Sequence, residues 1–186
     1  MRYLVGIILT CALLGIIGVY MYVHGQGGSP TLFGEPLLTT NKQSIVSSGR
    51  TVPNDALEYR SDFYGFSVLY PNYLQVREYP GGDNTTTLVF QNAEKPAGFQ
   101  IFILPYSAST ISAERFRKDI PSGVQKNLQT IQLSGADGAA FYSQDLALGE
   151  TYEVWVLHNG WLYEINSLAP LDEWLQSILG TWQFLN

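Results

Sequence analysis

Two glutamates in the C-terminal third of the sequence, Glu153 and Glu164, have a spacing that suits joint acid–base chemistry. They flank Asn159-Gly160, a pair typical of a two-residue type I′ turn, because both central positions of that turn need positive φ. This turn pairs Trp155 with Glu164 and makes the two glutamates diagonal neighbours on one hairpin face, about 6 to 8 Å apart. Carboxyl groups about 5 to 5.5 Å apart are the machinery of a retaining glycosidase. The sequence favours the alternative that both are solvated side chains on an outer face.

Other reactive residues indicate little chemistry. His158 is predicted at a strand end, where a structural role is expected, and no GxSxG motif supplies a nucleophile for a Ser-His-Asp hydrolase. The single cysteine, Cys11, and two histidines in separate regions form neither a disulfide nor a cluster of metal ligands. We therefore expect a non-enzymatic protein without a metal or another cofactor.

The segment that positions the hairpin, residues 57–186, alternates between short apolar runs and turn residues, as an antiparallel sheet does. A second two-residue turn is expected at Asp137-Gly138. Strands are expected at 57–60, 66–70, 85–92, 98–104, 128–133, 139–145, 151–158, 161–167 and 182–185. The second face of the glutamate hairpin is expected to be core, with Tyr152, Val154, Val156, Tyr163 and Ile165.

Two segments have the pattern of amphipathic helices. In ISAERFRKDIP, Ser112 is the expected N-cap, and Arg115 and Asp119 are spaced as an i,i+4 ion pair. In LAPLDEWLQSILGTW, Pro170 begins the helix and Gly180 ends it. The apolar stripe of this second helix is Leu171, Trp174, Leu175, Ile178 and Leu179. The expected fold class is therefore α+β, a half-buried antiparallel sheet covered by two helices.

The N-terminal segment has the composition of a membrane anchor. Residues 3–23, YLVGIILTCALLGIIGVYMYV, carry no charge and are long enough to cross a hydrocarbon core of about 30 Å. We predict a transmembrane helix at 1–23 and a flexible linker at 24–56, rich in Gly, Ser, Thr, Pro and Asn. A cleaved signal peptide is the main alternative, although its apolar region is usually about 7 to 15 residues long.

The charges around this segment predict its orientation. Arg2 precedes the apolar run and no charged residue follows before Glu35, so the N-terminus is expected in the cytoplasm and residues 57–186 outside it. The formal net charge is -6 and the basic residues are scattered, which excludes the concentrated positive face of a nucleic-acid-binding protein. Because only 14% of residues are charged and 46% are hydrophobic, we expect one packed domain at 57–186.

The order of signals in residues 57–186 resembles PsbP-like domains, the family of the extrinsic photosystem II subunit, whose fold also recurs in bacterial envelope lipoproteins of the DcrB and LpqN type. The matching segments are YRSDFYGFSVLYP, ISAERFRKDI, LSGADGAAFYS, TYEVWVLHNGWLYEI and ILGTWQFL. The resemblance implies an α/β/α sandwich that docks to membrane complexes or partners, with no catalytic motif to transfer. The chain departs from the photosynthetic members by its predicted anchor and from the lipoproteins by lacking a lipobox.

These observations predict a membrane-anchored, extracytoplasmic binding or assembly module of the cell envelope, with a protein partner. One alternative is a small-ligand carrier or sensor with an apolar cavity between sheet and helix. A further alternative is a carbohydrate-active hydrolase that uses Glu153 and Glu164. The candidate surface or ligand site is Glu153, Trp155 and Glu164.

Overall fold

A computed structural model of the chain describes residues 43–44 and 55–185. The predicted transmembrane helix at 1–23 and most of the predicted linker lie outside these residues. In the described part of the chain, no helix is both long and apolar enough to cross a membrane.

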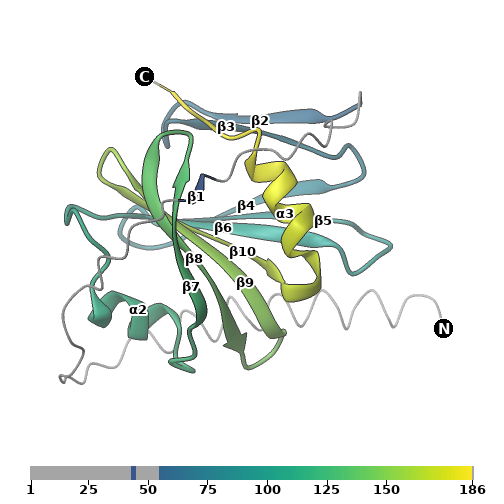
Figure 1. Cartoon of the computed structure of the whole chain (residues 1–186). Helices are drawn as coiled ribbons and strands as arrows, with labels where there is room; N and C mark the ends of the chain where they lie inside the picture. Colours follow the sequence, from purple (N-terminus) through teal and green to yellow (C-terminus); the bar gives the residue numbers. More distant parts are fainter. Residues whose placement is uncertain (1–42, 45–54, 186) are drawn as a thin grey trace.

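The centre of the fold is an eight-stranded sheet with the order β1-β7-β8-β9-β10-β6-β5-β4 (Figure 1). Neighbouring strands are antiparallel, except that β1 runs parallel to β7. The strands are β1 (Gln43–Ser44), β4 (Gln75–Pro80), β5 (Thr86–Gln91), β6 (Gly98–Pro105), β7 (Lys126–Leu133), β8 (Ala136–Asp145), β9 (Gly149–His158) and β10 (Trp161–Leu168).

Two of these strands were not among the expected ones. β4 has the sequence QVREYP, in which two charged residues and a proline hide the strand pattern. It lies at the edge of the sheet, where charged residues and Pro80 are tolerated because one side of the strand needs no backbone partner. β1 lies within the segment 24–56, so the sheet extends into part of the predicted linker. The nine expected strands are all present, with ends shifted by at most three residues.

The structure confirms one predicted turn and corrects the other. Asn159 and Gly160 have φ of 47° and 81°, and Trp161 pairs with His158 as expected. The turn between β7 and β8 is formed by Ser134-Gly135, with φ of 48° and 85°, and not by Asp137-Gly138, which lies inside β8. β8 starts at Ala136, three residues after Leu133, and both of these apolar residues are buried on either side of the earlier turn.

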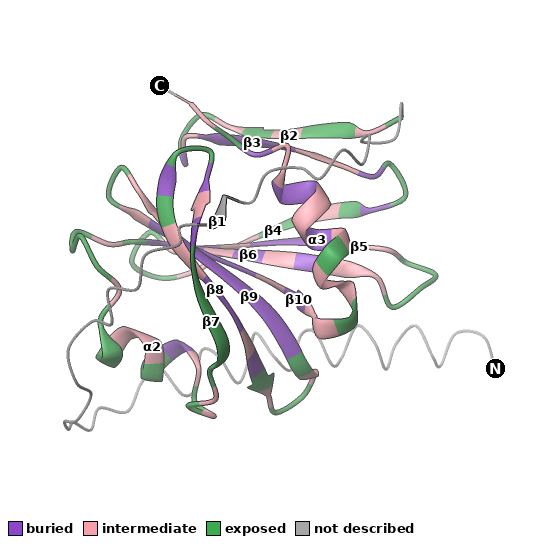
Figure 2. Ribbon diagram, in the orientation of Figure 1, coloured by how far each residue is buried: buried purple, intermediate pink, exposed green. Residues whose placement is uncertain are grey.

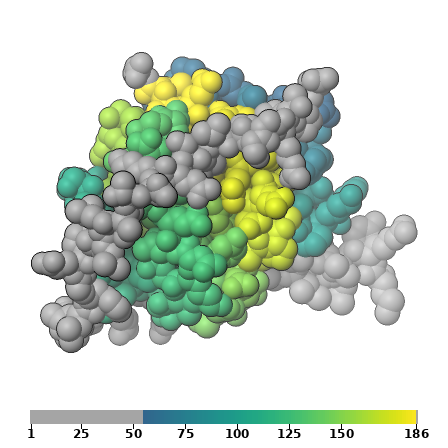
Figure 3. Space-filling model, viewed as in Figure 1, coloured from purple at the N-terminus to yellow at the C-terminus, as the bar shows by residue number. Residues whose placement is uncertain are grey.

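A second, three-stranded sheet and a helix cover one face of the large sheet. This sheet has the order β11-β3-β2, with β2 (Leu57–Ser61), β3 (Phe66–Tyr70) and β11 (Gln183–Phe184). The helix α3 (Asp172–Leu179) follows the short 3₁₀ turn η1 (Ala169–Leu171), and Gly180 caps it as predicted. In the space-filling view, this yellow C-terminal segment packs between the blue-to-teal strands and the green strands (Figure 3).

The main core lies between these layers. Phe66 is fully buried and stacks on Trp182 with ring centroids 4.3 Å apart, while the hydroxyl of Tyr163 donates a 2.5 Å hydrogen bond to the carbonyl of Tyr64. The core-facing residues predicted from the hairpin register are confirmed as buried: Tyr152, Val154, Val156, Tyr163 and Ile165. Buried residues follow these strands through the centre of the molecule (Figure 2).

The other helix, α2 (Ala113–Asp119), lies on the opposite face of the large sheet. Because side chains alternate along a strand, Trp155 points away from the core that contains Val154 and Val156. Trp155 belongs instead to a second apolar cluster, to which α2 contributes Phe116. The fold is therefore mostly β, with antiparallel sheets and two helices, and on one side a small sheet shares the covering layer with α3.

Candidate functional site

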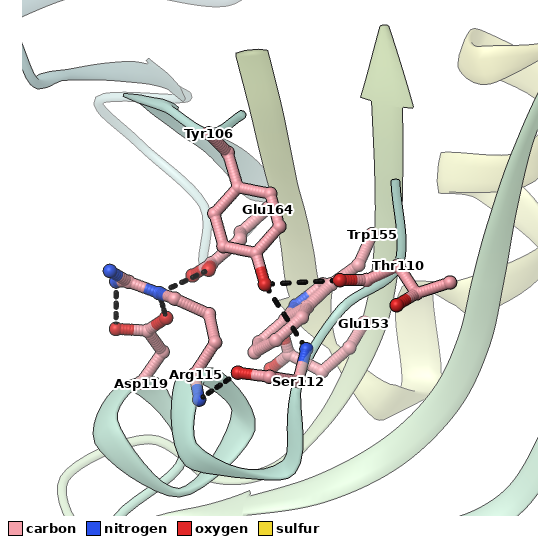
Figure 4. Close-up of polar contacts among 8 residues, drawn as sticks. All are labelled: Tyr106, Thr110, Ser112, Arg115, Asp119, Glu153, Trp155 and Glu164. Atoms are coloured by element: carbon pink, nitrogen blue, oxygen red, sulfur yellow. Dashed lines mark hydrogen bonds and ion pairs between the residues drawn. The ribbon is translucent and has the colours of Figure 1, made fainter. Parts of the chain in front are cut away.

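The predicted site lies beneath α2. The register of β9 and β10 pairs Trp155 with Glu164 and Glu153 with Asn166, as the turn predicted. The prediction that both glutamates are solvated is wrong, because Glu153 is 3% exposed and Glu164 is 5% exposed. Helix α2 covers this face of the hairpin and shields it from solvent (Figure 4).

Aromatic packing holds α2 on the sheet. The ring of Phe116 contacts the rings of Phe141 and Trp155, with centroids 5.6 and 5.9 Å apart. Phe141 and Trp155 in turn contact each other at 5.5 Å. Three aromatic rings from β8, β9 and α2 therefore form the apolar half of the site.

Local hydrogen bonds fix the start of the helix. The hydroxyl of Ser112 accepts from the backbone N–H of Arg115 at 3.0 Å, which confirms the predicted N-cap. The hydroxyl of Tyr106 donates to the carbonyl of Thr110 and accepts from the N–H of Ser112, both at 3.1 Å. These bonds brace the loop between β6 and α2, which orients the polar face of α2 toward the sheet (Figure 4).

The polar half of the site contains three buried carboxyl groups and one guanidinium group. Arg115 forms the predicted i,i+4 ion pair with Asp119 through two hydrogen bonds. Its Nε also lies 3.7 Å from Oε1 of Glu164. Asp119 is 8% exposed, so all three carboxyl groups have almost no contact with water, and Arg115 pairs with two of them, Asp119 and Glu164.

Glu153 is held in a partly protonated state. Its Oε1 accepts a 2.7 Å hydrogen bond from the Thr151 hydroxyl, and its Oε2 accepts one of 3.4 Å from the Trp155 indole. Burial raises the pKa of Glu153 to about 7, and the hydrogen bonds lower it only in part. Near neutral pH, the protonated and ionised forms of Glu153 are therefore both well populated.

The surroundings of Glu164 favour its neutral form. Burial raises the pKa of Glu164 well above its usual value, and the neighbouring Asp119 raises it further. Arg115 opposes this shift, but its stronger contact is with Asp119. Oε1 of Glu164 is buried and has no hydrogen-bond partner, which a carboxylate in this environment would need.

This geometry does not suit glycoside hydrolysis, which requires both carboxyl groups to reach a sugar in an open cleft. Glu153 and Glu164 lie under α2 and are 3% and 5% exposed, so a sugar has no open path to either carboxyl group. Among the described residues, no group of three or more His, Cys, Asp or Glu side chains has the arrangement of a metal site. The cluster is a buried group of carboxyl side chains that lies between α2 and the sheet and is joined to the helix through Arg115 and Asp119.

Sequence reasoning found Glu153, Trp155 and Glu164 as neighbours but missed the third carboxyl group. Asp119 was recognised only as the partner of Arg115 within the helix. Its approach to Glu164 depends on how α2 docks, which no local pattern records. One signal in the sequence could have indicated this approach. Arg115 and Asp119 lie next to Phe116 on a helix that must cover a sheet, so docking of Phe116 also brings the charged pair close to the strands.

A second feature is an aromatic cluster at the end of the sheet where β9 turns into β10. Phe63 is 71% exposed, and its ring lies 4.9 Å from the ring of Tyr64 and 5.7 Å from that of Trp161. His158, at the same strand end, stacks on Phe184 with centroids 3.9 Å apart, which agrees with its expected structural role. An exposed phenylalanine thus stands on an ordered aromatic base.

A third feature is a cavity of about 300 Å³ at the opposite end of the strands. Its walls come from β5, β6, β10 and two loops, at residues 95–97 and 147–148. Neither α2 nor α3 contributes to it, so it is not the cavity between sheet and helix that the carrier alternative predicted.

Comparison with known proteins supports the fold alone. No family model and no curated protein matches the sequence. Among solved structures, the chain is similar to cyanobacterial PsbP (CyanoP) from Synechocystis sp. PCC 6803, with a TM-score of 0.53 and 12% sequence identity. The match covers 73% of this chain and 95% of the cyanobacterial protein. The resemblance noted in the sequence thus holds at the level of architecture, and the chain has a PsbP-like fold.

Proposed function

We propose that this protein is a non-enzymatic binding or assembly module, held on the outer side of a membrane by its N-terminal apolar segment. The tether is the predicted helix at 1–23 with the linker that follows, and Arg2 before the apolar run supports the orientation. The folded part has the architecture of cyanobacterial PsbP. Its partner is a protein of the same membrane or envelope.

The exposed ring of Phe63, which packs on Tyr64 and Trp161, carries this proposal. Large aromatic residues are usually buried, and exposed ones are enriched at the centres of protein interfaces. Phe63 exposes 71% of its surface, although it belongs to a chain with many well-buried aromatic residues. Its contacts with Tyr64 and Trp161 order the ring before any partner binds, which lowers the entropy cost of binding.

The hydrolase alternative receives no support from the site geometry, since Glu153 and Glu164 are enclosed. The small-ligand alternative is favoured by one observation, the cavity at the far end of the sheet. The two ends of the sheet are separated by the length of β9, ten residues or about 33 Å. A partner at Phe63 and a ligand in the cavity would therefore not compete for the same surface.

A photocrosslinking experiment tests the proposal. The full chain is expressed in its native membrane with p-benzoylphenylalanine in place of Phe63, and in a control in place of Leu146, which is 87% exposed at the other end of β9. We expect one discrete membrane protein to crosslink at position 63 and not at position 146. A second control consists of the anchor and linker without residues 57–186.

Substitution provides the matching measurement. Phe63→Ala should weaken capture of that protein by about 30-fold, the loss typical of truncating an interface hot spot of about 2 kcal/mol. Leu146→Ala should leave capture unchanged. Equal crosslinking at positions 63 and 146, or unchanged capture by Phe63→Ala, would contradict the proposal.

A further inference from the structure

The cavity lies on the same face of the large sheet as the buried glutamates. Asn166 pairs with Glu153 in β9 and with Gln100 in β6, and Gln100 pairs with Val89 in β5. Directly paired residues point to the same side of a sheet, so this row continues from the acid cluster to the cavity. The β5–β6 and β8–β9 loops enclose the end of the row.

The lining combines an apolar surface with a few polar groups. Val89, Leu148 and Leu168 provide aliphatic side chains, and the loop adds Pro96 and Ala97. Gly98 pairs with Gln91, and a Cβ atom there would lie 2.5 Å from the carbonyl oxygen of Phe90, so glycine lets β5 and β6 approach closely at this end of the sheet. The strands and the two loops together enclose the cavity of about 300 Å³.

The polar groups of the lining have a definite chemical character. Gln91, Gln100 and Asn166 carry amides, which both donate and accept hydrogen bonds. Lys95 is the only charged residue among the described residues that line the cavity. A ligand with one negative charge is therefore matched by this lining, whereas a cation meets like charge and an entirely apolar molecule leaves the amides without partners.

The volume limits the size of such a ligand. Sites for small molecules usually range from about 300 to 1,000 Å³, and this cavity of about 300 Å³ lies at the lower end. A short aliphatic chain fits this space better than a lipid with two chains or a polysaccharide.

We propose that the cavity is a binding site for a small amphiphilic carboxylate. The aliphatic part packs against Val89, Leu148 and Leu168, and the carboxylate is bound by Lys95 with the amide of Gln100. This site lies beyond the proposed protein-binding function, because it is built from other residues at the other end of the sheet.

Three matched probes test this site: hexanoate, 1-hexanol and hexylammonium, which share a chain and differ in charge. Each is titrated into the ¹⁵N-labelled full chain in lipid nanodiscs, and the amide signals of Gly98 and Leu148 are followed by NMR. We expect saturable shifts with hexanoate, weaker binding of 1-hexanol and the weakest binding of hexylammonium. Local shifts separate binding in the cavity from partition into the nanodisc lipid.

Two variants assign the binding to the lining. Lys95 is exposed, so Lys95→Gln should weaken the binding of hexanoate by about fivefold, the upper end for an exposed ion pair, and leave the binding of 1-hexanol unchanged. Gln100→Trp should fill the cavity and abolish binding of hexanoate, while Gln129→Trp, the same change on an exposed position of β7, should preserve it.

Three results would overturn the site. They are the absence of saturable shifts with hexanoate, binding of hexylammonium or 1-hexanol as tight as that of hexanoate, and hexanoate affinity unchanged by Lys95→Gln. Crosslinking at position 63 is independent of all three, so failure here leaves the proposed function intact.

Discussion

Replacing Glu153 by Gln should make the protein more stable at neutral and alkaline pH. The carboxyl group is 3% exposed, and burial raises its pKa from the usual 4.5 to about 7. The folded state therefore retains a proton that the unfolded chain releases, between pH 4.5 and pH 7. Stability is greatest below pH 4.5 and falls as the pH rises through this range, because the unfolded state then binds fewer protons than the folded state.

The magnitude follows from the two pKa values. A difference of about 2.5 pKa units at 1.36 kcal/mol each gives about 3 kcal/mol for the whole range, of which about 2 to 3 kcal/mol falls between pH 5 and pH 8. Gln has the same shape and no charge to bury, so the stability of the variant does not decrease in this way as the pH rises. Its amide can accept from the Trp155 indole and donate to the Thr151 hydroxyl, two of the groups that form hydrogen bonds with Glu153.

The assay is urea denaturation of the full chain in nanodiscs, followed by tryptophan fluorescence, at pH 5, 6, 7 and 8. Glu164 has a pKa raised in the same direction and adds to the decline of the parent protein, so the decisive quantity is the difference between parent and variant. This difference should grow by about 2 to 3 kcal/mol from pH 5 to pH 8. Glu58→Gln, at an exposed position of β2, is the control. If the difference does not change with pH, Glu153 does not titrate as its burial requires.

Two substitutions test the packing and the hydrogen bonds of the core. Gly138→Ala should lower the free energy of unfolding in urea by about 2 kcal/mol, because its Cβ would lie 2.4 Å from the backbone oxygen of Trp155. Gly82→Ala is the control and should be nearly neutral, because a Cβ there has no atom within 4 Å. Similar losses for the two variants would contradict this explanation. Tyr163→Phe should cost about 1 to 2 kcal/mol in thermal or urea denaturation, because it leaves the buried carbonyl of Tyr64 without its donor. Tyr73→Phe, on a half-exposed ring, should have no effect, and equal stability of both Tyr variants would refute the role of this bond.

Local sequence determined the β9–β10 hairpin and therefore the neighbours in the candidate site. Asn159-Gly160 supplies the two positive-φ residues of the turn, and a two-residue turn fixes the partner of every later residue. The side of the sheet to which Glu153, Trp155 and Glu164 point followed from alternation along the strands. The start of α2 at the Ser112 cap is local in the same way, since the cap bonds a backbone group three residues away.

Local sequence did not determine the position of the β7–β8 turn, because two neighbouring dipeptides could each form it. Asp137-Gly138 and Ser134-Gly135 both suit positive φ, and the choice between them depends on which register buries Leu133, Ala136 and Ala140 in the core. β4 was missed for a related reason. Its strand character comes from its pairing with β5, because QVREYP carries the charges and the proline of an exposed edge.

Only the tertiary structure determined whether the hairpin face that carries Glu153 and Glu164 is exposed to solvent or buried. The sequence showed the carboxyl groups, the helix and the ion pair of Arg115 and Asp119 as separate local features. Burial of Glu153 and Glu164 required α2, which ends thirty residues before β9 begins, to dock on that face through Phe116. The pKa of a carboxyl group depends on the water and charges around it in space, so local spacing predicted which residues meet and long-range packing set their chemistry.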